Sequence, residues 1–296
     1  MKITIIGAGA WGKALGYVAE KSGHEVSFWS RSNLVLPVHT DVFIAAVPAQ
    51  HMREAMGTIA IGTAPLISAA KGIERHTGKM IAEVCHEVAP QSEFYALSGP
   101  SFAADVIAGL PTAVALAGPT LGQAMNLAEA LSTKHFRIYP TDDVMGVEIG
   151  GAMKNVLAIA CGIVAGAGLG ESARASLVTR GFAELSRYAK ARGAKAETLM
   201  GLSGFGDLML TCSSTKSRNY SYGLAVGQGL SLVEALAQSR GVVEGAYTAG
   251  VAAELSRAQN IDMPIVTAVA NVVAGHSSPH DEIVKLLGRP LRAENE

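Results

Sequence analysis

The order of apolar and polar residues divides the chain into two halves. In the first half, short apolar runs alternate with segments of helical periodicity, such as 78–88 and 120–131. The apolar runs lie at 3–6, 25–29, 42–47, 65–69, 94–97, 112–117 and 136–139. This alternation is typical of βαβ units. It predicts an α/β domain with a doubly wound, mainly parallel sheet and helices on both faces.

The second half of the chain has a different pattern of apolar and polar residues. From about Asp143 onward, long segments with helical period dominate, and little resembles a strand. Helices are predicted over 152–165, 173–192, 217–226, 245–259 and 264–274. Ser231 and Glu234 form a capping box that opens a short helix ending at Gln238. The pattern predicts two domains, 1–142 and an all-helical domain 143–296.

A glycine-rich turn, GAGAWG, follows the first predicted strand and precedes a helix. In that context it matches the G-x-G-x-x-G dinucleotide fingerprint. Gly7 permits the tight turn, Gly9 lets the backbone approach a pyrophosphate, and Gly12 lets the helix pack closely. The phosphates would lie at the positive helix N-terminus. A turn that binds nothing is the alternative, but the flanking strands favour a Rossmann-type dinucleotide-binding domain. The predicted contacts are Gly7, Gly9, Ala10, Trp11 and Gly12.

In the predicted dinucleotide-binding domain, the segment after the second strand is unusually short. Only a loop fits between Arg31 and Asp41, whereas a parallel crossover needs about a dozen residues. A standard dinucleotide half has another strand and helix here. We predict that the chain has lost this unit or replaced it with residues 34–38, which would thin the wall beside the adenine.

The same region bears on cofactor choice. NAD sites usually carry an acid after the second strand to hold the ribose 2′-hydroxyl. This chain has Trp29-Ser30-Arg31 there, without an acid. Arg31 would pair with a 2′-phosphate, although a solvated loop arginine is the alternative. We predict NADP, as NADPH, as the preferred cofactor, with NAD also accepted.

Composition and charge narrow the class of protein. A length of 296 residues suits two domains, and a net charge of −1 implies no bulk attraction to nucleic acid or an anionic membrane. The three cysteines are widely spaced and predict reduced thiols. The histidines show no ligand spacing, so no metal is expected. The longest apolar stretch, 156–169, is too short to span a bilayer and predicts a buried helix. With no secretory segment visible, we expect a cytoplasmic protein.

Two lysines lie at positions where a functional role is plausible. Lys71 follows a buried strand, where open α/β sheets bind ligands. Lys154 opens an apolar helix and has small and apolar neighbours on both sides, which is unusual for lysine. Lysines on a solvated surface are the alternative for both.

Two polar segments accompany them. The turn Ser98-Gly99-Pro100-Ser101 also follows a strand and can bring its backbone near a cofactor; an ordinary Gly-Pro turn is the alternative. Residues 204–219 combine glycines with Asp207, hydroxyls, an arginine and an amide. That composition suits a small phosphorylated substrate, although a polar loop between helices would look similar.

Taken together and in order, these motifs identify a family. They are Gly7–Gly12 followed by Lys13-Ala14-Leu15, Ala46-Val47-Pro48, Ala70-Lys71-Gly72, Gly99-Pro100-Ser101, Lys154-Asn155, Gly206-Asp207, Ser217-Arg218-Asn219 and Val243-Glu244-Gly245. The chain resembles bacterial NAD(P)-dependent sn-glycerol-3-phosphate dehydrogenases along nearly its whole length, except around residues 32–40. The resemblance implies a 6-phosphogluconate-dehydrogenase-like helical domain. It also implies interconversion of dihydroxyacetone phosphate and sn-glycerol 3-phosphate for phospholipid biosynthesis, and it suggests a homodimer.

The resemblance also implies roles for residues. Lys154 would be the catalytic acid/base, Lys71 would polarise the carbonyl, and Asp207 would orient Lys154 or a substrate hydroxyl. A lysine with a pKa of about 10.4 is too basic for this work; burial and the second cation would lower it, while Asp207 would oppose the shift. The implied substrate contacts are Lys71, Gly99, Ser101, Lys154, Asp207, Thr211, Ser217, Arg218 and Asn219. The implied cofactor contacts beyond the fingerprint and Arg31 are Lys71, Ala103, Arg218, Val242 and Glu244.

Two other functions remain open at this point. A hydroxy-acid or ketopantoate-type dehydrogenase pairs a similar domain with helices, and Arg218 would then hold a carboxylate. A non-catalytic NADP-sensing protein is the second alternative, and the shortened adenosine side favours it mildly. Intact Lys71, Lys154 and Asp207 argue against a protein without turnover.

Overall fold

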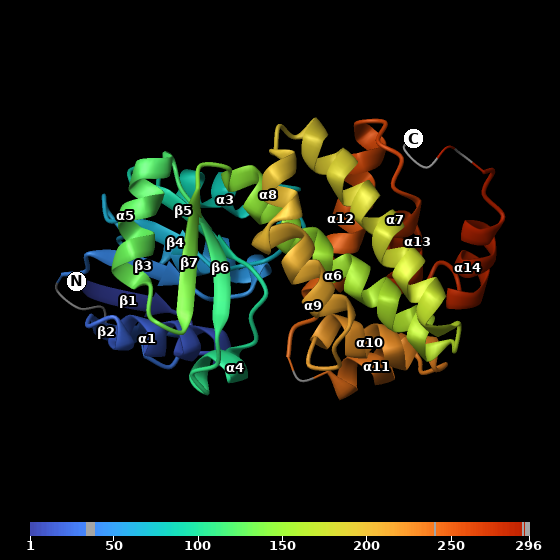
Figure 1. Cartoon of the computed structure of the whole chain (residues 1–296), viewed down its shortest axis with the longest axis horizontal. Coiled ribbons are helices and arrows are strands. Elements are labelled where there is room, and N and C mark those ends of the chain that lie inside the picture. Colours follow the sequence, from blue (N-terminus) through green and yellow to red (C-terminus); the bar gives the residue numbers. More distant parts are fainter. Residues whose placement is uncertain (34–38, 240, 292, 294–296) are drawn as a thin grey trace.

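The computed structural model describes residues 1–33, 39–239, 241–291 and 293. An α/β domain and a helical domain lie side by side (Figure 1). The predicted division at residue 142 falls between strand β7 (Phe136–Thr141) and helix α6 (Val144–Gly166). The predicted replacement of the missing unit by residues 34–38 lies outside the described residues.

A seven-stranded sheet forms the centre of the first domain. Its strands are β1 (Lys2–Ile6), β2 (Glu25–Trp29), β3 (Val42–Ala45), β4 (Leu66–Ser68), β5 (Phe94–Ser98), β6 (Thr112–Ala117) and β7. They follow the order β2-β1-β3-β4-β5-β6-β7, and only the β5–β6 pair is antiparallel. Ile6 of β1 pairs with Trp29 and Ala45, so the ends of these strands are level. The predicted mainly parallel sheet is confirmed.

Strand β2 is the edge of this sheet among the described residues. In the standard dinucleotide order a further strand lies outside the equivalent of β2. The described part of the chain contains no such strand, which agrees with the predicted loss of a strand–helix unit.

Helices cover both faces of the sheet, as a doubly wound fold requires. They are α1 (Ala10–Lys21), the 3₁₀ turn η1 (Ala49–His51), α2 (Met52–Gly57), α3 (Ile81–Val88), α4 (Ala103–Ile107) and α5 (Leu121–Leu131). Ala14, Leu15 and Val18 of α1 pack with Ile3 and Ile5 in one core cluster. The α2 and α3 side chains build a separate cluster with Ile6 and Phe43 on the other face; its helical members include Met52, Met56, Ile81 and Val84.

The second domain is all helical. Its further elements are α7 (Gly170–Ala191), α8 (Ala196–Met200), the π turn η2 (Leu202–Gly206), α9 (Asp207–Cys212), α10 (Arg218–Gly227), α11 (Leu232–Gln238), α12 (Glu244–Ala258), α13 (Pro264–Val273) and α14 (Pro279–Leu287). Helix α6 runs through the middle and is buried along almost its whole length. Gly162 and Gly166 lie against the backbone of α10, where a Cβ would come within 2.1–2.2 Å of a carbonyl oxygen. The close α6–α10 contact therefore depends on these glycines.

Helix α6 is longer than the predicted 152–165. It begins at Val144, and the Asp143 side chain accepts a hydrogen bond from the Gly146 N–H at 2.9 Å. At 23 residues the helix is longer than the apolar stretch 156–169 and long enough by length and composition to cross a bilayer. Because 89% of its most apolar window is buried inside the protein, α6 is a core helix.

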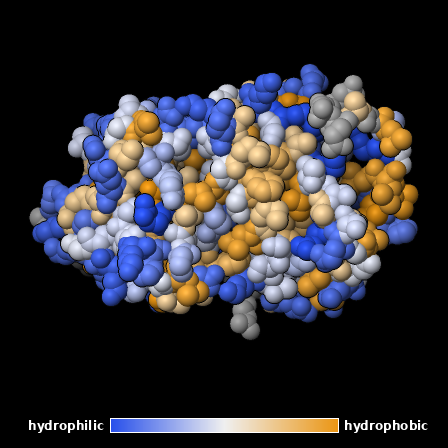
Figure 2. All heavy atoms as spheres, in the orientation of Figure 1, coloured by the Kyte–Doolittle hydropathy of each residue, from blue (hydrophilic) through white to orange (hydrophobic). Residues whose placement is uncertain are grey.

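The surface differs between the two domains. Figure 2 shows mainly hydrophilic residues over the α/β domain, at the left of this view, and more apolar atoms over the helical domain. The exposed large apolar side chains of the helical domain include Leu169, Met200, Phe205, Met209, Val233 and Leu287. The helical domain therefore offers more apolar surface than the sheet domain.

Candidate active site

The glycine turn after β1 has the geometry of a phosphate cradle. Gly7 has a φ of 104°, and a Cβ on it would lie 2.9 Å from the Ala46 carbonyl oxygen. A Cβ on Gly12 would lie 1.8 Å from the Gly7 carbonyl oxygen. A Cβ on Gly9 would meet nothing within 4 Å, which leaves open space at the N-terminus of α1. These residues fit a dinucleotide pyrophosphate.

The end of β2 carries the residues predicted to meet the adenosine. Ser30 and Asn33 exchange two backbone hydrogen bonds of 2.8–2.9 Å, so Arg31 and Ser32 form a tight two-residue turn. Arg31 is exposed on this turn. Residues 29–33 contain no acid that would repel a phosphate.

Where the two domains meet, one carboxylate lies between two ammonium groups. Lys71 donates to Asp207 Oδ2 at 2.7 Å, and Lys154 donates to Asp207 Oδ1. Lys154 also donates to the Thr211 hydroxyl at 3.0 Å, and that hydroxyl donates to Asp207 Oδ1 at 3.2 Å. Lys71 donates further to the Gly99 carbonyl at 3.1 Å. The structure thus brings together the three predicted catalytic residues.

Three separate elements deliver these side chains. Lys71 follows β4, Lys154 lies within α6, and Asp207 is the first residue of α9. Residues 202–206 form the π turn η2 that leads into α9, so the alternative of a polar loop is wrong for this part of the segment. A Cβ on Gly150 of α6 would lie 2.6 Å from the Ser203 carbonyl oxygen, and this close approach brings Asp207 to Lys154.

Burial and charge set the ionisation of this cluster. Asp207 is 0% exposed and Lys154 is 6% exposed. Burial lowers the pKa of Lys154 to about 7; the Asp207 carboxylate opposes this shift and the Lys71 ammonium adds to it. Burial by itself would raise the pKa of Asp207, but the two ammonium groups outweigh it and hold that pKa below its usual value. Lys154 can therefore exchange a proton near neutral pH.

The predicted turn after β5 borders this cluster. The Gly99 carbonyl accepts hydrogen bonds from Lys71 and from the Ser101 hydroxyl, both at 3.1 Å. Gly99 has a φ of 153°, and a Cβ on it would lie 2.8 Å from the Val114 Cα. Ala103 begins helix α4 two residues after Ser101.

Ser217, Arg218 and Asn219, which are predicted to bind the substrate phosphate, differ in the contacts that their side chains make. The Ser217 side chain caps α10 by accepting from the Tyr220 N–H at 3.3 Å. The Asn219 amide donates to Asn155 and accepts from the Gly245 N–H, both at 2.9 Å. The Arg218 side chain is exposed and makes no hydrogen bond or ion pair with the described residues. Of these three side chains, Arg218 alone has its donors unused within the described structure.

Glu244, at the start of α12, joins the two domains. Its Oε1 accepts from the Ala49 N–H at 3.1 Å, and its Oε2 is buried without a partner among the described residues. A Cβ on Gly72 would lie 3.1 Å from that Oε2. Burial raises the pKa of Glu244 to about 7, although the Ala49 N–H and the Arg218 charge lower it. Val242 precedes this contact by two residues and is half-buried.

Sequence reasoning assigned no role to Asn155, which the structure places inside the site. Its amide donates to the Lys71 carbonyl at 3.1 Å, and its Oδ1 accepts from Asn219. Asn155 therefore links the backbone of the sheet domain to α10. Its position beside Lys154 in the Lys-Asn motif was the available signal.

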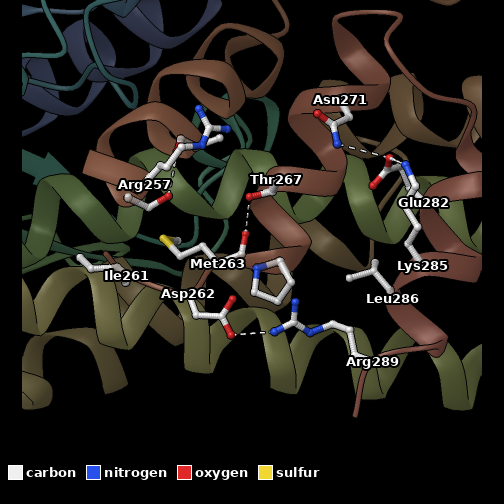
Figure 3. Close-up of a pocket in the computed structure, with 13 residues that line it drawn as sticks. Arg257, Ile261, Asp262, Met263, Thr267, Asn271, Glu282, Lys285, Leu286 and Arg289 are labelled. Atoms are coloured by element: carbon white, nitrogen blue, oxygen red, sulfur yellow. Dashed lines mark hydrogen bonds and ion pairs between the residues drawn. The ribbon is translucent and has the colours of Figure 1, made fainter. Parts of the chain in front are cut away.

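A separate cavity of about 380 Å³ lies between α12, α13 and α14 (Figure 3). Its two carboxylates are paired within it: Arg289 reaches Asp262 at 2.7 Å, and Lys285 reaches Glu282 at 2.7 Å. None of the predicted catalytic or binding residues lines it. The predicted catalytic residues lie between the two domains, away from this cavity.

Comparison with known proteins agrees with this geometry. The model of the NAD-dependent glycerol-3-phosphate dehydrogenase C-terminus matches residues 143–284, and that of the N-terminus matches residues 2–39 and 37–124. The chain belongs to the NAD-dependent glycerol-3-phosphate dehydrogenase family. It is therefore an oxidoreductase that depends on NAD or NADP, with the predicted 6-phosphogluconate-dehydrogenase-like fold. This membership favours an enzyme over the non-catalytic sensor, and glycerol 3-phosphate over a hydroxy acid.

Individual relatives are similar over their full lengths. Glycerol-3-phosphate dehydrogenases [NAD(P)+] from Erythrobacter litoralis and Parvibaculum lavamentivorans are each 45% identical to this chain. These alignments cover 100% and 99% of this chain and 98% of each relative. The crystal structure of a glycerol-3-phosphate dehydrogenase from Coxiella burnetii has a TM-score of 0.90 at 33% identity, covering 97% of this chain and 99% of that one.

The comparisons also bear on the length of this chain. The alignment with the Erythrobacter protein runs over 325 positions, against 296 residues in this chain, a difference of 29. The two pieces of the N-terminal family match meet at residues 37–39. This chain is therefore shorter than this relative, and the break in the family match falls in the segment where a standard dinucleotide half has a further strand and helix.

Proposed function

We propose that the enzyme reduces dihydroxyacetone phosphate to sn-glycerol 3-phosphate, with NADPH as the preferred reductant and NADH as a second choice. The observation that carries this proposal is the buried Lys71–Asp207–Lys154 cluster beside the Gly99 turn. In the cell, this reaction would supply glycerol 3-phosphate for glycerophospholipid synthesis. Membership of the family supports the reaction.

Lys154 acts as the acid/base in this proposal. When bound, the nicotinamide cofactor supplies the hydride for reduction and accepts it in the reverse direction. Reduction of the ketone leaves an alkoxide, which the Lys154 ammonium protonates; oxidation needs the neutral amine. A pKa of about 7 lets Lys154 serve both directions. Lys71 stabilises negative charge on the same oxygen, and Asp207 holds both amines in place.

Arg218 and the N-terminus of α10 bind the substrate phosphate in this proposal. The Arg218 donors are unused within the described residues, and α10 presents its positive end there. The side chains of Ser217 and Asn219 already have partners. Their predicted contribution is therefore indirect: Ser217 caps the helix, and Asn219 fixes its first turn. Gly99 and Ser101 remain the predicted contacts at the glycerol end.

In this proposal, the cofactor extends from Arg31 to Glu244. Gly7, Gly9, Ala10, Trp11 and Gly12 cradle the pyrophosphate in this proposal. Arg31, exposed on its turn and without an acidic neighbour, pairs with the 2′-phosphate. Ala103, Val242 and Glu244 remain predicted contacts nearer the reacting end.

One assay series tests the substrate and the cofactor. NADPH oxidation is followed with dihydroxyacetone phosphate, then with NADH in place of NADPH, and then with a panel of keto acids in place of the phosphate. We expect turnover of dihydroxyacetone phosphate with both cofactors and a higher kcat/KM for NADPH. Turnover of keto acids alone would overturn the substrate, and equal kcat/KM values would overturn the cofactor preference.

We also propose a cytoplasmic homodimer. The three cysteines, Cys85, Cys161 and Cys212, are free and buried, which suits a reducing compartment. The exposed apolar side chains of the helical domain supply surface that a second copy could cover. Light scattering after size-exclusion chromatography should give twice the chain mass of 30.6 kDa; a single-chain mass would contradict the dimer.

A further inference from the structure

Helix α6 contacts the sheet domain along one face. Glu148, Gly151 and Asn155 are spaced by three and four residues, so they lie above one another on the helix. Glu148 Oε1 accepts from the Ala82 N–H of α3 at 2.9 Å, and Asn155 donates to the Lys71 carbonyl at 3.1 Å. Between them, a Cβ on Gly151 would lie 2.8 Å from Ser98 Oγ. Two hydrogen bonds and one close approach thus hold α6 against α3, the segment after β4, and β5.

A neighbouring face of α6 carries the chemistry. Gly150 packs on the backbone of Ser203 and Gly204, and Lys154 reaches Asp207. A rotation or slide of α6 against the sheet domain would therefore move Lys154 relative to Lys71, which follows β4. The three contacts of the first face resist this movement.

Glu148 makes the outermost of these contacts by capping a helix of the other domain. The N-cap residue of α3 is Met80, which has no side-chain oxygen to accept the first N–H groups. Glu83 of α3 turns back to accept from the Met80 N–H at 2.7 Å. The Ala82 N–H, at the second position of the helix, is left for Glu148. The N–H group at this position is normally bonded by the side chain of the helix's own N-cap residue. Here the accepting side chain comes from α6 instead.

The surroundings favour a neutral cap. Burial raises the pKa of Glu148 to about 8; the Ala82 and Ile81 N–H groups and the Arg192 charge pull it down, and Glu83 pushes it up. At neutral pH the carboxyl group is mostly protonated, so the cap does not bury a full charge. The other oxygen, Oε2, has no partner among the described residues.

We propose that Glu148 is a positioning residue for the reaction: by capping α3 from α6, it sets the register of the two domains and with it the place of Lys154 beside Lys71. This inference rests on the proposed dehydrogenase activity. Glu148 contacts none of the predicted cofactor or substrate residues, so its effect reaches the reaction through α6.

The helical domain offers a matched control. Glu184 of α7 is 2% exposed and accepts from the Ile265 and Val266 N–H groups at 2.8 and 3.1 Å, at the start of α13. Burial raises its pKa as well, to about 7. Glu184 thus caps a helix in trans from a buried position, but both partners lie in one domain. Losing this cap costs stability without touching the interface between the domains.

The experiment compares Glu148→Met, Glu148→Gln and Glu184→Met in the full chain. Methionine keeps the volume and removes the acceptor, while glutamine keeps an acceptor for the Ala82 N–H. For each variant, kcat for dihydroxyacetone phosphate is divided by the folded fraction from circular dichroism, and the Kd for NADPH is measured by fluorescence titration.

We expect Glu148→Met to lose about 100-fold in kcat per folded enzyme, because misplacing a reacting group by about 1 Å has effects of that order. Its Kd for NADPH should stay within about threefold, Glu148→Gln should recover kcat to within about threefold, and Glu184→Met should match the wild type. An unchanged kcat in Glu148→Met, an equal loss in Glu184→Met, or no recovery in Glu148→Gln would overturn the inference alone. A wild-type enzyme without turnover would overturn the proposed function as well.

Discussion

The residues predicted to react and the residue predicted to bind the adenosine 2′-phosphate are held in opposite ways. At the reacting end, Lys154, Lys71 and Asp207 come from three elements, are largely buried and hold one another. At the adenosine end, Arg31 stands exposed on a tight turn beside the edge strand β2. The alignment with the Erythrobacter relative runs over 29 more positions than this chain has residues, and the two pieces of the N-terminal family match join just after Arg31, at residues 37–39.

The difference has an energetic cause. Removing one member of a buried charge pair leaves an uncompensated charge and costs about 3–5 kcal/mol. An exposed charge contributes about 0–1 kcal/mol to stability. Replacing Arg31 should therefore cost the fold little, whereas removing one member of the lysine–aspartate cluster should cost it much more.

The largest effect is expected at the reacting end, from Lys154→Ala. Loss of a general acid/base costs about 10²–10⁴-fold in rate, so kcat should fall by about that factor. The NADPH Kd should change little, because Lys154 lies on α6 and the glycine turn lies in the other domain. Steady-state rates and fluorescence titration measure the two quantities. Retained turnover would assign the acid/base to another residue.

Asp207→Asn should come next. Asparagine keeps the shape but leaves two ammonium groups close together without a carboxylate, so we expect kcat to fall by about 100-fold, a loss of about 3 kcal/mol. Because the Asp207 charge raises the pKa of Lys154, the acid/base pKa should also move further down. The kcat–pH profile of the variant measures this shift. An upward shift would contradict the arrangement.

At the adenosine end, Arg31→Ala should act on the cofactor alone. Losing a charge-assisted contact of about 1.5–3 kcal/mol predicts a rise of about 10- to 100-fold in the KM for NADPH. The KM for NADH and the kcat with either cofactor should stay near wild-type values. Parallel titrations with the two cofactors make the comparison, and equal effects on both would show that Arg31 does not bind the 2′-phosphate.

The smallest effect is expected from pH in the wild-type enzyme, where the kcat values for reduction and for oxidation should change in opposite directions. Reduction needs the protonated Lys154, so its kcat should fall as the pH rises above about 7. Oxidation of glycerol 3-phosphate needs the neutral amine, so its kcat should fall below about 7. The Arg31→Ala variant should show the same two profiles. Profiles that run in parallel would argue against a single group with both roles.

Much of the fold could be predicted from the sequence because its signals are local. The glycine turn fixes its own backbone: Gly7 needs a positive φ, and Gly12 leaves no room for a Cβ. The alternation of strands and helices followed from residue spacing alone. The start of α6 was missed because its first two turns owe their helical state to packing against the sheet domain and to the Asp143 cap.

The site was predictable as a set of residues and less so as an arrangement. Motifs named Lys71, Lys154 and Asp207, but the Lys154–Asp207 contact joins residues 53 positions apart. Ser217 and Asn219 were assigned to the phosphate, and the structure turns their side chains to other partners. The sequence contains no signal for the path of a side chain once helices pack against each other.

By itself, therefore, the sequence determined the two domains, the family and the glycine turn after β1, because backbone conformation and hydrophobic period depend on neighbouring residues. Only the tertiary structure decided the ionisation of Lys154, since its pKa of about 7 comes from burial and from charges delivered by β4 and α9. It also decided that Glu148 caps a helix of the other domain. Both depend on packing between distant segments, which local patterns do not encode.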